Sequence, residues 1–294
     1  MMFSGRTKNL AVIGWPIAHS LSPVMQNAAL QKAGLDFAYI ALPVAPADLP
    51  EAVLGLRALG FRGFNVTIPH KTAIIPLLDE VDAAARAIGA VNTVVLEEGR
   101  LKGCNTDAAG FIGALEARSF SLAGKRVVLL GAGGAARAVL WGLFQAGAAE
   151  IVIGVRNPQK ARPLAEEFSR YGTIRLFEWH EESFRHAVRA AELVVNATSL
   201  GMVPEIEASP PIPWEEVQPG TFFYDIIYTP AETSFLRRAA AQGCPVLNGE
   251  GMLVGQGAAA FKLWTGKTAD FAVMAEALHG ALERGRSKKP KPER

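Results

Sequence analysis

A glycine-rich turn follows an apolar strand near the middle of the sequence. Residues Val127–Leu130 are typical of a buried strand, and the segment Gly131–Ala136 comes directly after them and begins an amphipathic helix. Glycines let the chain turn tightly and let its backbone approach a pyrophosphate, while the free N–H groups of a helix N-terminus attract negative charge. We therefore expect dinucleotide binding here, in preference to a tight strand–helix turn without a ligand.

The strand after that helix, Glu150–Val155, indicates which dinucleotide is bound. NAD enzymes usually carry an Asp or Glu about 20 residues after the glycine loop, where it binds the ribose 2′-hydroxyl. Here the strand is followed by Arg156 and Asn157, with Lys160 one turn into the next helix. Arg156 can bind a 2′-phosphate through its planar guanidinium, and Lys160 adds a second positive charge. NADP is the expected cofactor; the alternative is that both cations only face solvent.

Polar residues gather where strands are expected to end in the first third of the chain. They are Ser20, Ser22, Asn65, Thr67, Lys71, Asn92, Thr93, Asn105, Thr106 and Asp107. Parallel α/β sheets bind ligands at the carboxyl ends of their strands. Hydroxyls, amides, one Lys and one Asp suit a small polyhydroxylated anion. Structural roles stay open as well: Ser22 before Pro23 is an expected helix N-cap, and Asp107 is favourable at a helix start.

Lys71 is the main candidate for proton transfer. It lies two residues after Pro69, where we expect the first turn of a helix, and the helix dipole disfavours a cation there, so function explains this Lys better than stability does. A ketone reduced by hydride develops negative charge on oxygen and needs a proton, which a Lys ammonium can donate. A free Lys has a pKa near 10.4, and a neighbouring Asp107 raises it. As a base in the reverse direction, Lys71 needs desolvation, or Asp107 shares the role.

Strands and helices alternate along almost the whole chain, which predicts an α/β fold with mostly parallel sheets. The expected strands are Leu10–Ile13, Phe37–Leu42, Phe61–Val66, Thr93–Glu97, Leu101–Asn105, Arg126–Leu130, Glu150–Val155, Ile174–Phe177, Leu193–Asn196, Thr221–Ile226 and Pro245–Leu247. The last six match the strand count of a doubly wound Rossmann sheet. Helices are expected between the strands, from Ser22 to Gly34, and at Met252–Trp264 and Asp270–Glu283.

The expected organisation has two α/β domains. We expect a substrate-binding domain at residues 1–107, a Rossmann domain at 108–247, helices at 248–284 that return to pack on the first domain, and a basic disordered tail at 285–294. Between Arg284 and Arg294 there are six Lys or Arg and one Glu, and the rest of the chain has a net charge of −3. Charge therefore gives no reason to expect a nucleic-acid partner.

Composition narrows the protein class further. The chain is 50% hydrophobic and 20% charged, as in globular proteins, and its apolar stretches are far shorter than the roughly 18 residues that a membrane span needs. We interpret Cys104 and Cys244 as reduced thiols of a cytoplasmic protein. The five His are scattered, so no metal site is expected, and His70 is expected on a helix surface. The chain is expected to be a monomer or a homodimer.

Several motifs occur together in a characteristic order. They are His19–Pro23, Asn65–Lys71, Gly89–Thr93, Gly103–Asp107, the glycine loop, Asn196–Met202, Asp225–Pro230 and Gly249–Gln256. From about residue 8 to 283 the chain resembles the shikimate dehydrogenase family. The resemblance implies a substrate domain and a Rossmann domain whose cleft closes on ligands. It also implies an oxidoreductase that reversibly reduces 3-dehydroshikimate to shikimate with NADPH, in aromatic amino-acid biosynthesis.

The resemblance implies a role for each site residue. The substrate carboxylate would be bound by Ser20, Ser22 and Tyr228, and the ring hydroxyls by Thr67, Asn92 and Gln256. Lys71 and Asp107 would flank the carbon that gains or loses hydride, as an acid–base pair. The cofactor would be bound by Gly131, Ala132, Gly133, Gly134 and Ala135 at the pyrophosphate, Arg156, Asn157 and Lys160 at the 2′-phosphate, and Ile226 and Gly249 beside the nicotinamide.

Two positions depart from the family pattern. Asn157 stands where the family often has a Thr, which removes one phosphate contact and predicts a weaker preference for NADP. Ala83 stands where the family often has a carboxylate near the cofactor.

A quinate or dual quinate/shikimate dehydrogenase, often NAD-linked, is the nearest alternative function. A non-catalytic nucleotide-sensing regulator would be expected to have lost Lys71 or Asp107. A folate-linked or amino-acid dehydrogenase of similar plan lacks support in the Ser20–Ser22 and Gln256 motifs.

Overall fold

The computed structural model describes residues 4–287, and side chains as far as residue 284. These residues form two compact units: unit 1 comprises the described residues of Met1–Thr106 and Val254–Arg294, and unit 2 comprises Asp107–Leu253. The first unit thus ends one residue before the predicted boundary at 107, and the chain returns to it at Val254 rather than at 248. The predicted tail, residues 285–294, lies outside the residues whose side chains are described, although α10 extends to Ser287.

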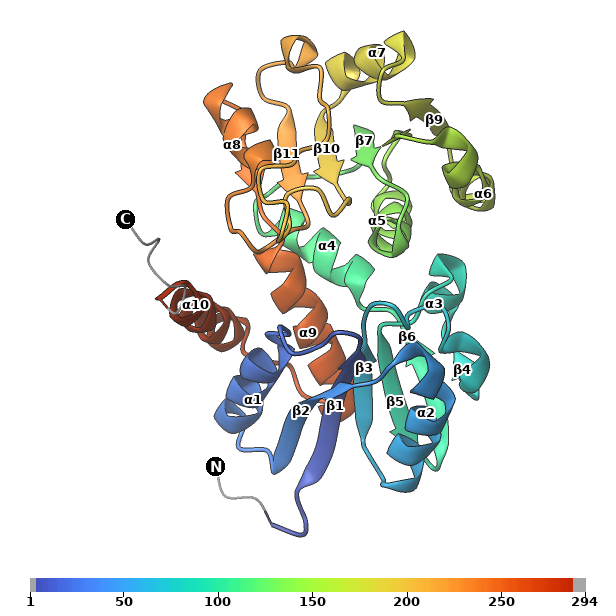
Figure 1. Cartoon of the computed structure of the whole chain (residues 1–294), viewed down its shortest axis with the longest axis vertical. Helices are drawn as coiled ribbons and strands as arrows, with labels where there is room; N and C mark the ends of the chain where they lie inside the picture. Colours follow the sequence, from blue (N-terminus) through green and yellow to red (C-terminus); the bar gives the residue numbers. More distant parts are fainter. Residues whose placement is uncertain (1–3, 288–294) are drawn as a thin grey trace. The chain divides into compact units, whose positions relative to one another are not determined.

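Unit 1 is built on a mixed sheet (Figure 1). Within residues 4–287 this sheet has six strands in the order β2-β1-β3-β5-β6-β4. Their bounds are β1 (Lys8–Gly14), β2 (Phe37–Pro43), β3 (Gly63–Val66), β4 (Glu80–Val81), β5 (Thr93–Glu97) and β6 (Arg100–Cys104). Strands β1, β2 and β3 are parallel, whereas β5 is antiparallel to both β3 and β6. The carboxyl ends of β1, β3 and β6 therefore share one edge of the sheet with the start of β5.

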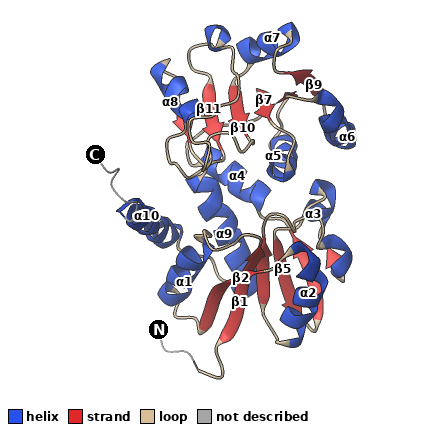
Figure 2. Ribbon diagram, viewed as in Figure 1, coloured by secondary structure: helices blue, strands red, loops and turns tan. Residues whose placement is uncertain are grey.

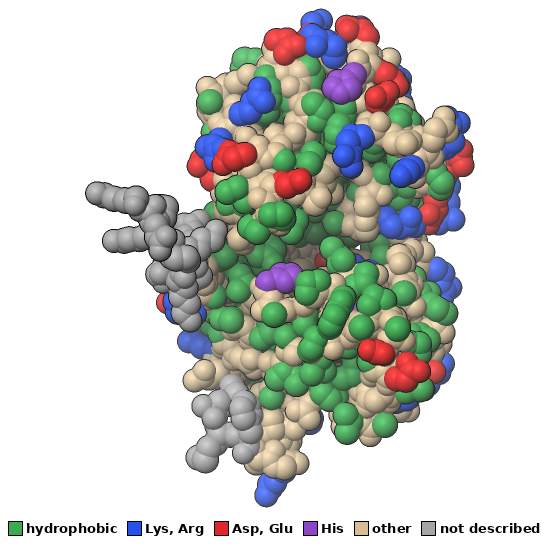
Figure 3. Space-filling view, viewed as in Figure 1, with side chains coloured by type: hydrophobic (Ala, Val, Ile, Leu, Met, Phe, Trp, Pro, Cys, Tyr) green, Lys and Arg blue, Asp and Glu red, His purple; other side chains and the backbone are tan. Residues whose placement is uncertain are grey.

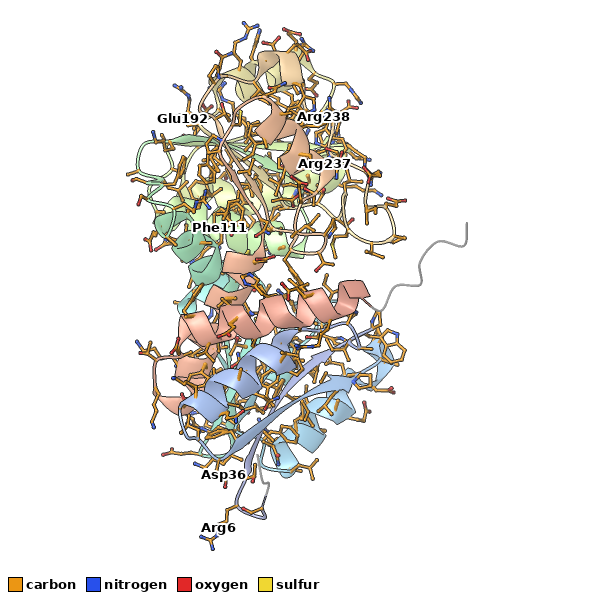
Figure 4. The ribbon with its side chains drawn as sticks, turned by 90° about the vertical axis from the view of Figure 1, so that its left-hand side faces the viewer. Arg6, Asp36, Phe111, Glu192, Arg237 and Arg238 are labelled. Carbon is orange, nitrogen blue, oxygen red and sulfur yellow. The ribbon has the colours of Figure 1, made fainter. Side chains whose placement is uncertain are left out.

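Helices pack on both faces of this sheet (Figure 2). They are α1 (Ser22–Lys32), α2 (Leu49–Ala58), α3 (Ala83–Ile88), α9 (Glu250–Thr265) and α10 (Phe271–Ser287), with 3₁₀ turns at Pro46–Asp48 and Ile75–Leu77. Figure 4 shows α10 lying along α1. The Gln26 side chain donates to the carbonyl of Gly257 at 2.9 Å, and the indole of Trp264 donates to the carbonyl of Val94 at 2.9 Å. The last helices thus complete unit 1, as the sequence predicts.

Unit 2 has the strand order of a doubly wound nucleotide-binding fold. Its strands are β7 (Arg126–Leu130), β8 (Glu150–Val155), β9 (Ile174–Glu178), β10 (Leu193–Asn196), β11 (Phe222–Asp225) and β12 (Val246–Leu247). In the described part of the chain they pair in the order β12-β11-β10-β7-β8-β9, with every pair parallel. The order reverses between β7 and β10, and ligands of such sheets bind at the carboxyl side of this reversal.

The helices of unit 2 explain why its strands read as unbroken apolar runs. They are α4 (Asp107–Glu116), α5 (Gly134–Gln145), α6 (Pro158–Phe168), α7 (Glu182–Ala190) and α8 (Ser234–Ala241), with 3₁₀ turns at Ser169–Tyr171 and Trp214–Glu216. Val127 and Leu129 of β7 join one buried cluster, whereas Val128 and Leu130 join another. Alternate residues of one strand face opposite sides, so a sheet covered on both faces needs apolar residues throughout. Phe111 of α4, labelled in Figure 4, stacks on Tyr224 of β11 at 5.0 Å.

Charged side chains of both signs are interspersed on the face of unit 2 shown in Figure 3. No helix among the described residues is long and apolar enough to cross a membrane. The same residues contain no group of three or more His, Cys, Asp or Glu arranged to hold a metal ion.

Candidate active site

The predicted substrate residues of unit 1 converge on the sheet edge described above. Asn65 near the end of β3 pairs in register with Thr93, the first residue of β5, and Thr93 pairs with Cys104, the last residue of β6. The antiparallel direction of β5 therefore brings Asn92 to the edge where β3 ends. Thr67 follows β3 directly, and its N–H donates to the carbonyl of Ile13 in β1 at 3.0 Å.

Neutral hydrogen bonds fix the buried side chains of this edge. The phenol of Tyr39 donates to Oδ1 of Asn65 at 2.6 Å, and Nδ2 of Asn65 donates to Oγ1 of Thr93 at 3.0 Å. Nδ2 of Asn92 donates to Oγ1 of Thr106 at 3.0 Å, and the Thr106 N–H donates back to Oδ1 of Asn92 at 2.8 Å. We call these five residues the amide–hydroxyl network. Networks of this kind orient each donor and acceptor, which suits recognition of neutral hydroxyl groups.

Ser20 lies in the loop between β1 and α1, and Ser22 is the first residue of α1; both are half-buried, and the Ser22 N–H donates to Oγ of Ser20 at 3.4 Å. The prediction that Ser22 is the N-cap of this helix is wrong. Leu21 is the N-cap, in the αR region and without a side-chain capping bond, and Ser22 is already helical. The Ser22 hydroxyl instead bonds to the phenol oxygen of Tyr39; burial raises the pKa of Tyr39 well above its ordinary value despite this bond. Ser22 is thereby linked to the amide–hydroxyl network.

Lys71 lies in a turn, and the prediction of a helix at this point is wrong. A 3₁₀ turn, Ile75–Leu77, follows it. Pro76 has no N–H to donate to the carbonyl of Thr72, so an α-helix cannot continue through this segment. The helix dipole is therefore no reason to expect a functional Lys here. The geometry gives a different reason to expect a functional Lys here. The Lys71 carbonyl accepts from the N–H of Val91 at 2.8 Å, so half-buried Lys71 is held beside Val91, next to Asn92 in the chain.

His70 is buried, contrary to the prediction of a helix-surface position. Its side chain is 1% exposed, and Nε2 lies 2.8 Å from the carbonyl oxygen of Val44. His70 anchors the turn in unit 1, while Lys71 next to it stays partly accessible.

The remaining predicted substrate residues come from both units. Gln256 lies on the part of α9 that belongs to unit 1, half-buried, and its neighbour Gly257 is the acceptor for Gln26 of α1. Asp107 is the first residue of α4 in unit 2 and is buried, in the position that the helix dipole favours for a carboxylate. Burial raises the pKa of Tyr228, also in unit 2, so its phenol stays protonated and can donate.

The glycine loop of unit 2 has the shape that a pyrophosphate requires. Gly131 has a φ of +99°, and a Cβ added to it would lie 2.8 Å from Cγ2 of Thr198. Gly133 and Gly134, where α5 begins, have open space in place of a side chain, so a ligand can approach their backbone. The Gly131 N–H donates to the carbonyl of Gly154 at 2.9 Å, which ties the loop to β8. Residues 131–135 therefore fit an anion at the N-terminus of α5.

The loop after β8 carries the cations predicted to select the cofactor. Arg156 and Lys160 are both exposed. Asn157 has a structural role: it is the N-cap of α6, and its Oδ1 accepts from the N–H of Lys160 at 3.2 Å. Asn157 therefore holds Lys160 in the first turn of α6, close to Arg156 in the chain.

Ile226 and Gly249 are held together by their backbones. The Gly249 N–H donates to the carbonyl of Ile227 at 2.9 Å, and a Cβ on Gly249 would collide with the carbonyl oxygen of Ile226. The Ile226 N–H donates to the carbonyl of Asn196 at 3.1 Å. The two residues predicted to border the nicotinamide thus lie in adjoining loops at the carboxyl end of the unit 2 sheet.

Sequence reasoning assigned no role to Tyr39 or Asp225, although both are buried centres of hydrogen bonding. Tyr39 lies in an apolar strand, and no local pattern marks its partners, which are distant in sequence. Asp225 ends a strand as a lone carboxylate after Phe222–Tyr224. An acidic residue closing an otherwise apolar strand is a signal that could have identified it.

Comparison with known families covers most of the chain. Residues 12–94 match the family described as Shikimate dehydrogenase substrate binding domain, residues 114–203 match Shikimate / quinate 5-dehydrogenase, and residues 249–279 match Shikimate 5'-dehydrogenase C-terminal domain. The chain is 50% identical over 275 residues to the NADP(+) shikimate dehydrogenase of Moorella thermoacetica, covering 93% of each protein.

Solved structures agree with these matches. A shikimate 5-dehydrogenase from Listeria monocytogenes, in complex with shikimate and NAD, is 36% identical with a TM-score of 0.90 and covers 95% of this chain and 98% of its own. The enzyme from Thermus thermophilus, in complex with NADP(H) and shikimate, is 43% identical with a TM-score of 0.84, at 93% and 99% coverage. By sequence and by fold, the chain belongs to the shikimate dehydrogenase family.

Proposed function

We propose that this protein reversibly reduces 3-dehydroshikimate to shikimate with NADPH. The observation that carries the proposal is the sheet edge of unit 1, where the amide–hydroxyl network adjoins the turn that holds Lys71. Fixed neutral donors and acceptors beside one cation match a small acid with several hydroxyl groups and one reducible carbonyl. NADP(+) shikimate dehydrogenases that are 40% and 50% identical to this chain support the same reaction for it.

Lys71 is the proton donor in this proposal. NADPH, when bound, supplies the hydride that reduces the substrate ketone. The Lys71 ammonium donates a proton to the carbonyl oxygen as negative charge develops there, which completes the alcohol. In the reverse direction the neutral amine accepts the hydroxyl proton. Asp107 is the second member of the proposed acid–base pair.

Substrate binding is assigned to hydroxyls and amides. Ser20 and Ser22, with the protonated phenol of Tyr228, donate to the substrate carboxylate. Thr67, Asn92 and Gln256 bind ring hydroxyls. Asn92 is suited to this role because its amide is already oriented by two bonds with Thr106.

Cofactor binding is assigned to unit 2. The backbone of Gly131, Ala132, Gly133, Gly134 and Ala135 binds the pyrophosphate, and Ile226 and Gly249 border the nicotinamide. Arg156 and Lys160 bind the 2′-phosphate, while Asn157 contributes by capping the helix that carries Lys160. This arrangement favours NADP over NAD, because no carboxylate ends β8.

The test is a steady-state assay of the purified protein, following NADPH at 340 nm with shikimate or quinate and with NADP or NAD. Turnover mainly with shikimate and NADP is the expected result. Preference for quinate or NAD would be consistent with the proposed role of Lys71 but would contradict the proposed specificity for shikimate and NADP. No turnover in any of the four mixtures would contradict the proposed function and favour a nucleotide-sensing role.

We also infer a cytoplasmic protein that is a monomer or a homodimer. Cys104 and Cys244 are both free and buried, and burial raises the pKa of the Cys104 thiol to about 12, so this thiol is unreactive at neutral pH. Light scattering during size-exclusion chromatography measures the oligomeric state directly.

A further inference from the structure

We propose that Asp225 is a positioning residue for NADP: its buried carboxylate fixes the loops after β10 and β11 against the glycine loop and Gly249. The proposal rests on the proposed function, because it assumes that unit 2 binds the dinucleotide at this end of its sheet. It assigns a role to the segments Asn196–Met202 and Asp225–Pro230, in which only Ile226 and Tyr228 have one so far.

The Asp225 carboxylate accepts from three donors, one at the end of β10 and two at opposite ends of the loop between β11 and α8. Oδ1 accepts from Nδ2 of Asn196 at 3.1 Å and from the N–H of Ile227 at 3.0 Å. Oδ2 accepts from Oγ1 of Thr233 at 2.7 Å. Asp225 is 0% exposed and these three donors are all neutral, so it is a buried anion held by hydrogen bonds alone. Burial raises its pKa to about 6, although the three bonds act in the opposite direction.

Such a group is costly for a fold to keep. A buried carboxylate held only by neutral donors loses its hydration, and apolar residues of similar size often replace buried charges without loss of stability. What the carboxylate provides is geometry. An Asn in its place has one acceptor oxygen and presents an NH₂ group to one of the three donors, and Leu has no acceptor. With its two acceptor oxygens, this one side chain holds the end of β10 and both ends of the loop between β11 and α8.

One path leads from Asp225 to the glycine loop. Asn196, oriented by Asp225, accepts with Oδ1 from the N–H of Thr198 at 3.0 Å and from its hydroxyl at 2.7 Å. The methyl carbon of Thr198, Cγ2, lies 2.8 Å from the position that a Cβ on Gly131 would occupy. In the sheet, Asn196 pairs with Leu130, the residue before Gly131, at the reversal of strand order where ligands bind. Asp225 therefore helps to position Thr198, the residue against which Gly131 of the glycine loop packs.

A second path leads to the residues assigned to the nicotinamide. Asp225 holds the N–H of Ile227, and the carbonyl of Ile227 holds the N–H of Gly249 at 2.9 Å. Thr233, the third donor, is the N-cap of α8, and its Oγ1 accepts from the N–H of Leu236 at 3.3 Å. The carboxylate thus fixes both ends of the loop between β11 and α8, and through it the position of Gly249.

The test uses the full chain and two independent readouts. The Kd of NADP+ is measured by calorimetry without substrate, and the KM values of NADP+ and shikimate by steady-state assay. Asp225→Asn keeps the size of the side chain and the Oδ1 acceptor, and turns an NH₂ group towards the Thr233 hydroxyl. Losing one hydrogen bond to a charged group should raise the Kd and KM of NADP+ about tenfold, with the KM of shikimate unchanged.

Glu216→Gln is the matched control. Glu216 is also a buried carboxylate of unit 2, at 8% exposure, but it precedes β11 and pairs with Arg185 and Arg189 of α7. Glu216→Gln should lower the melting temperature of the protein and leave the Kd of NADP+ unchanged. If Glu216→Gln raises that Kd as much as Asp225→Asn does, the effect is general destabilisation and the proposal is overturned. An unchanged Kd in Asp225→Asn overturns it as well.

Two substitutions at Thr233 keep the proposal testable if Asp225→Asn fails to fold. Thr233→Val removes the hydroxyl donor at constant size and should raise the Kd of NADP+, whereas Thr233→Ser keeps the hydroxyl and should retain the wild-type Kd. Equal Kd values for these two variants would contradict the proposal. A wild-type protein that binds NADP+ without turning over shikimate would contradict the proposed function and leave the Asp225 comparison valid.

Discussion

The two units present their ligand-binding ends in different ways. In the proposed function, unit 1 binds the substrate through side chains, oriented by the neutral bonds that run from Tyr39 to Thr106. Unit 2 is proposed to use backbone N–H groups at the glycine loop, shaped by loops that the buried carboxylate of Asp225 ties together. Fixed side chains distinguish the positions of individual hydroxyls, whereas a backbone cradle recognises the charge and shape of any pyrophosphate. Substrate choice should therefore respond to many residues, and cofactor choice to Arg156, which lies outside the cradle.

The largest effect should come from the one cation of the unit 1 turn. Lys71→Ala removes the proposed proton donor and should lower kcat about 10²–10⁴-fold, the usual range for positioned acid–base groups. The Kd of NADP+ should stay unchanged, since that site belongs to unit 2. Lys102→Ala, at an exposed Lys on β6, is the control and should keep the wild-type kcat. A near-normal kcat for Lys71→Ala would remove Lys71 from the mechanism.

Next comes the pH dependence of the buried anion in unit 2. The pKa of Asp225 is about 6 in the folded protein against an ordinary 3.8, so the folded chain keeps this proton to higher pH than the unfolded chain. The protonated Asp225 carboxyl makes its full contribution to the free energy of unfolding below about pH 4, and this contribution is lost as the pH rises through 6. Between pH 4 and 7, wild type should lose about 2 kcal/mol of unfolding free energy relative to Asp225→Asn. Urea denaturation at each pH measures the difference; a constant difference would contradict the prediction.

A smaller effect should separate cofactor choice from cofactor binding. Arg156→Ala removes a charge-assisted bond to the 2′-phosphate and should raise the KM of NADP+ about tenfold, while the KM of NAD+ stays the same. Arg162→Ala, at an exposed Arg further along α6, should change neither value. Equal increases for NADP+ and NAD+ would show that Arg156 acts on the whole loop and not on the phosphate.

The smallest effect should come from the network of unit 1. Tyr39→Phe removes only the hydroxyl that donates to Asn65 and accepts from Ser22, and should raise the KM of shikimate several-fold, in line with one neutral hydrogen bond. Tyr224→Phe is the matched control in unit 2, because the buried Tyr224 hydroxyl has no hydrogen-bond partner within the described residues. Its KM values should match wild type. If both variants behave alike, the network does not orient Ser22 and Asn65 for the substrate.

Local sequence signals predicted the strands well, because strands that are buried on both faces are apolar throughout. Thr93–Glu97, Arg126–Leu130 and Leu193–Asn196 have the predicted bounds. The two-residue strand β4 was not predicted, since Glu80 and Val81 form no periodic pattern and pair with β6 only through the tertiary fold. Placing polar residues at strand ends was enough to group Asn65, Asn92 and Thr106 from the sequence alone.

Predictions failed where a residue's role depends on contacts distant in sequence. Ser22 before Pro23 is typical of a helix N-cap, but its hydroxyl bonds to Tyr39 instead, and Leu21 is the N-cap residue. The helix expected at Lys71 fails at Pro76, which lies within the segment and could have been weighed. His70 is buried because Val44 offers a carbonyl to it, and sequence alone does not show that contact.

Unit 1 is made from two separate stretches of chain, and this sets the order in which the molecule can be completed. The Val94 carbonyl in β5 receives its bond from Trp264, and Tyr39 packs against the same indole at 5.9 Å between ring centroids. Domains generally fold as units during synthesis, beginning with residues made first. Here, however, all of unit 2 leaves the ribosome before Trp264 does. Unit 1, the unit proposed to bind the substrate, is therefore the first to begin folding and the last to be completed.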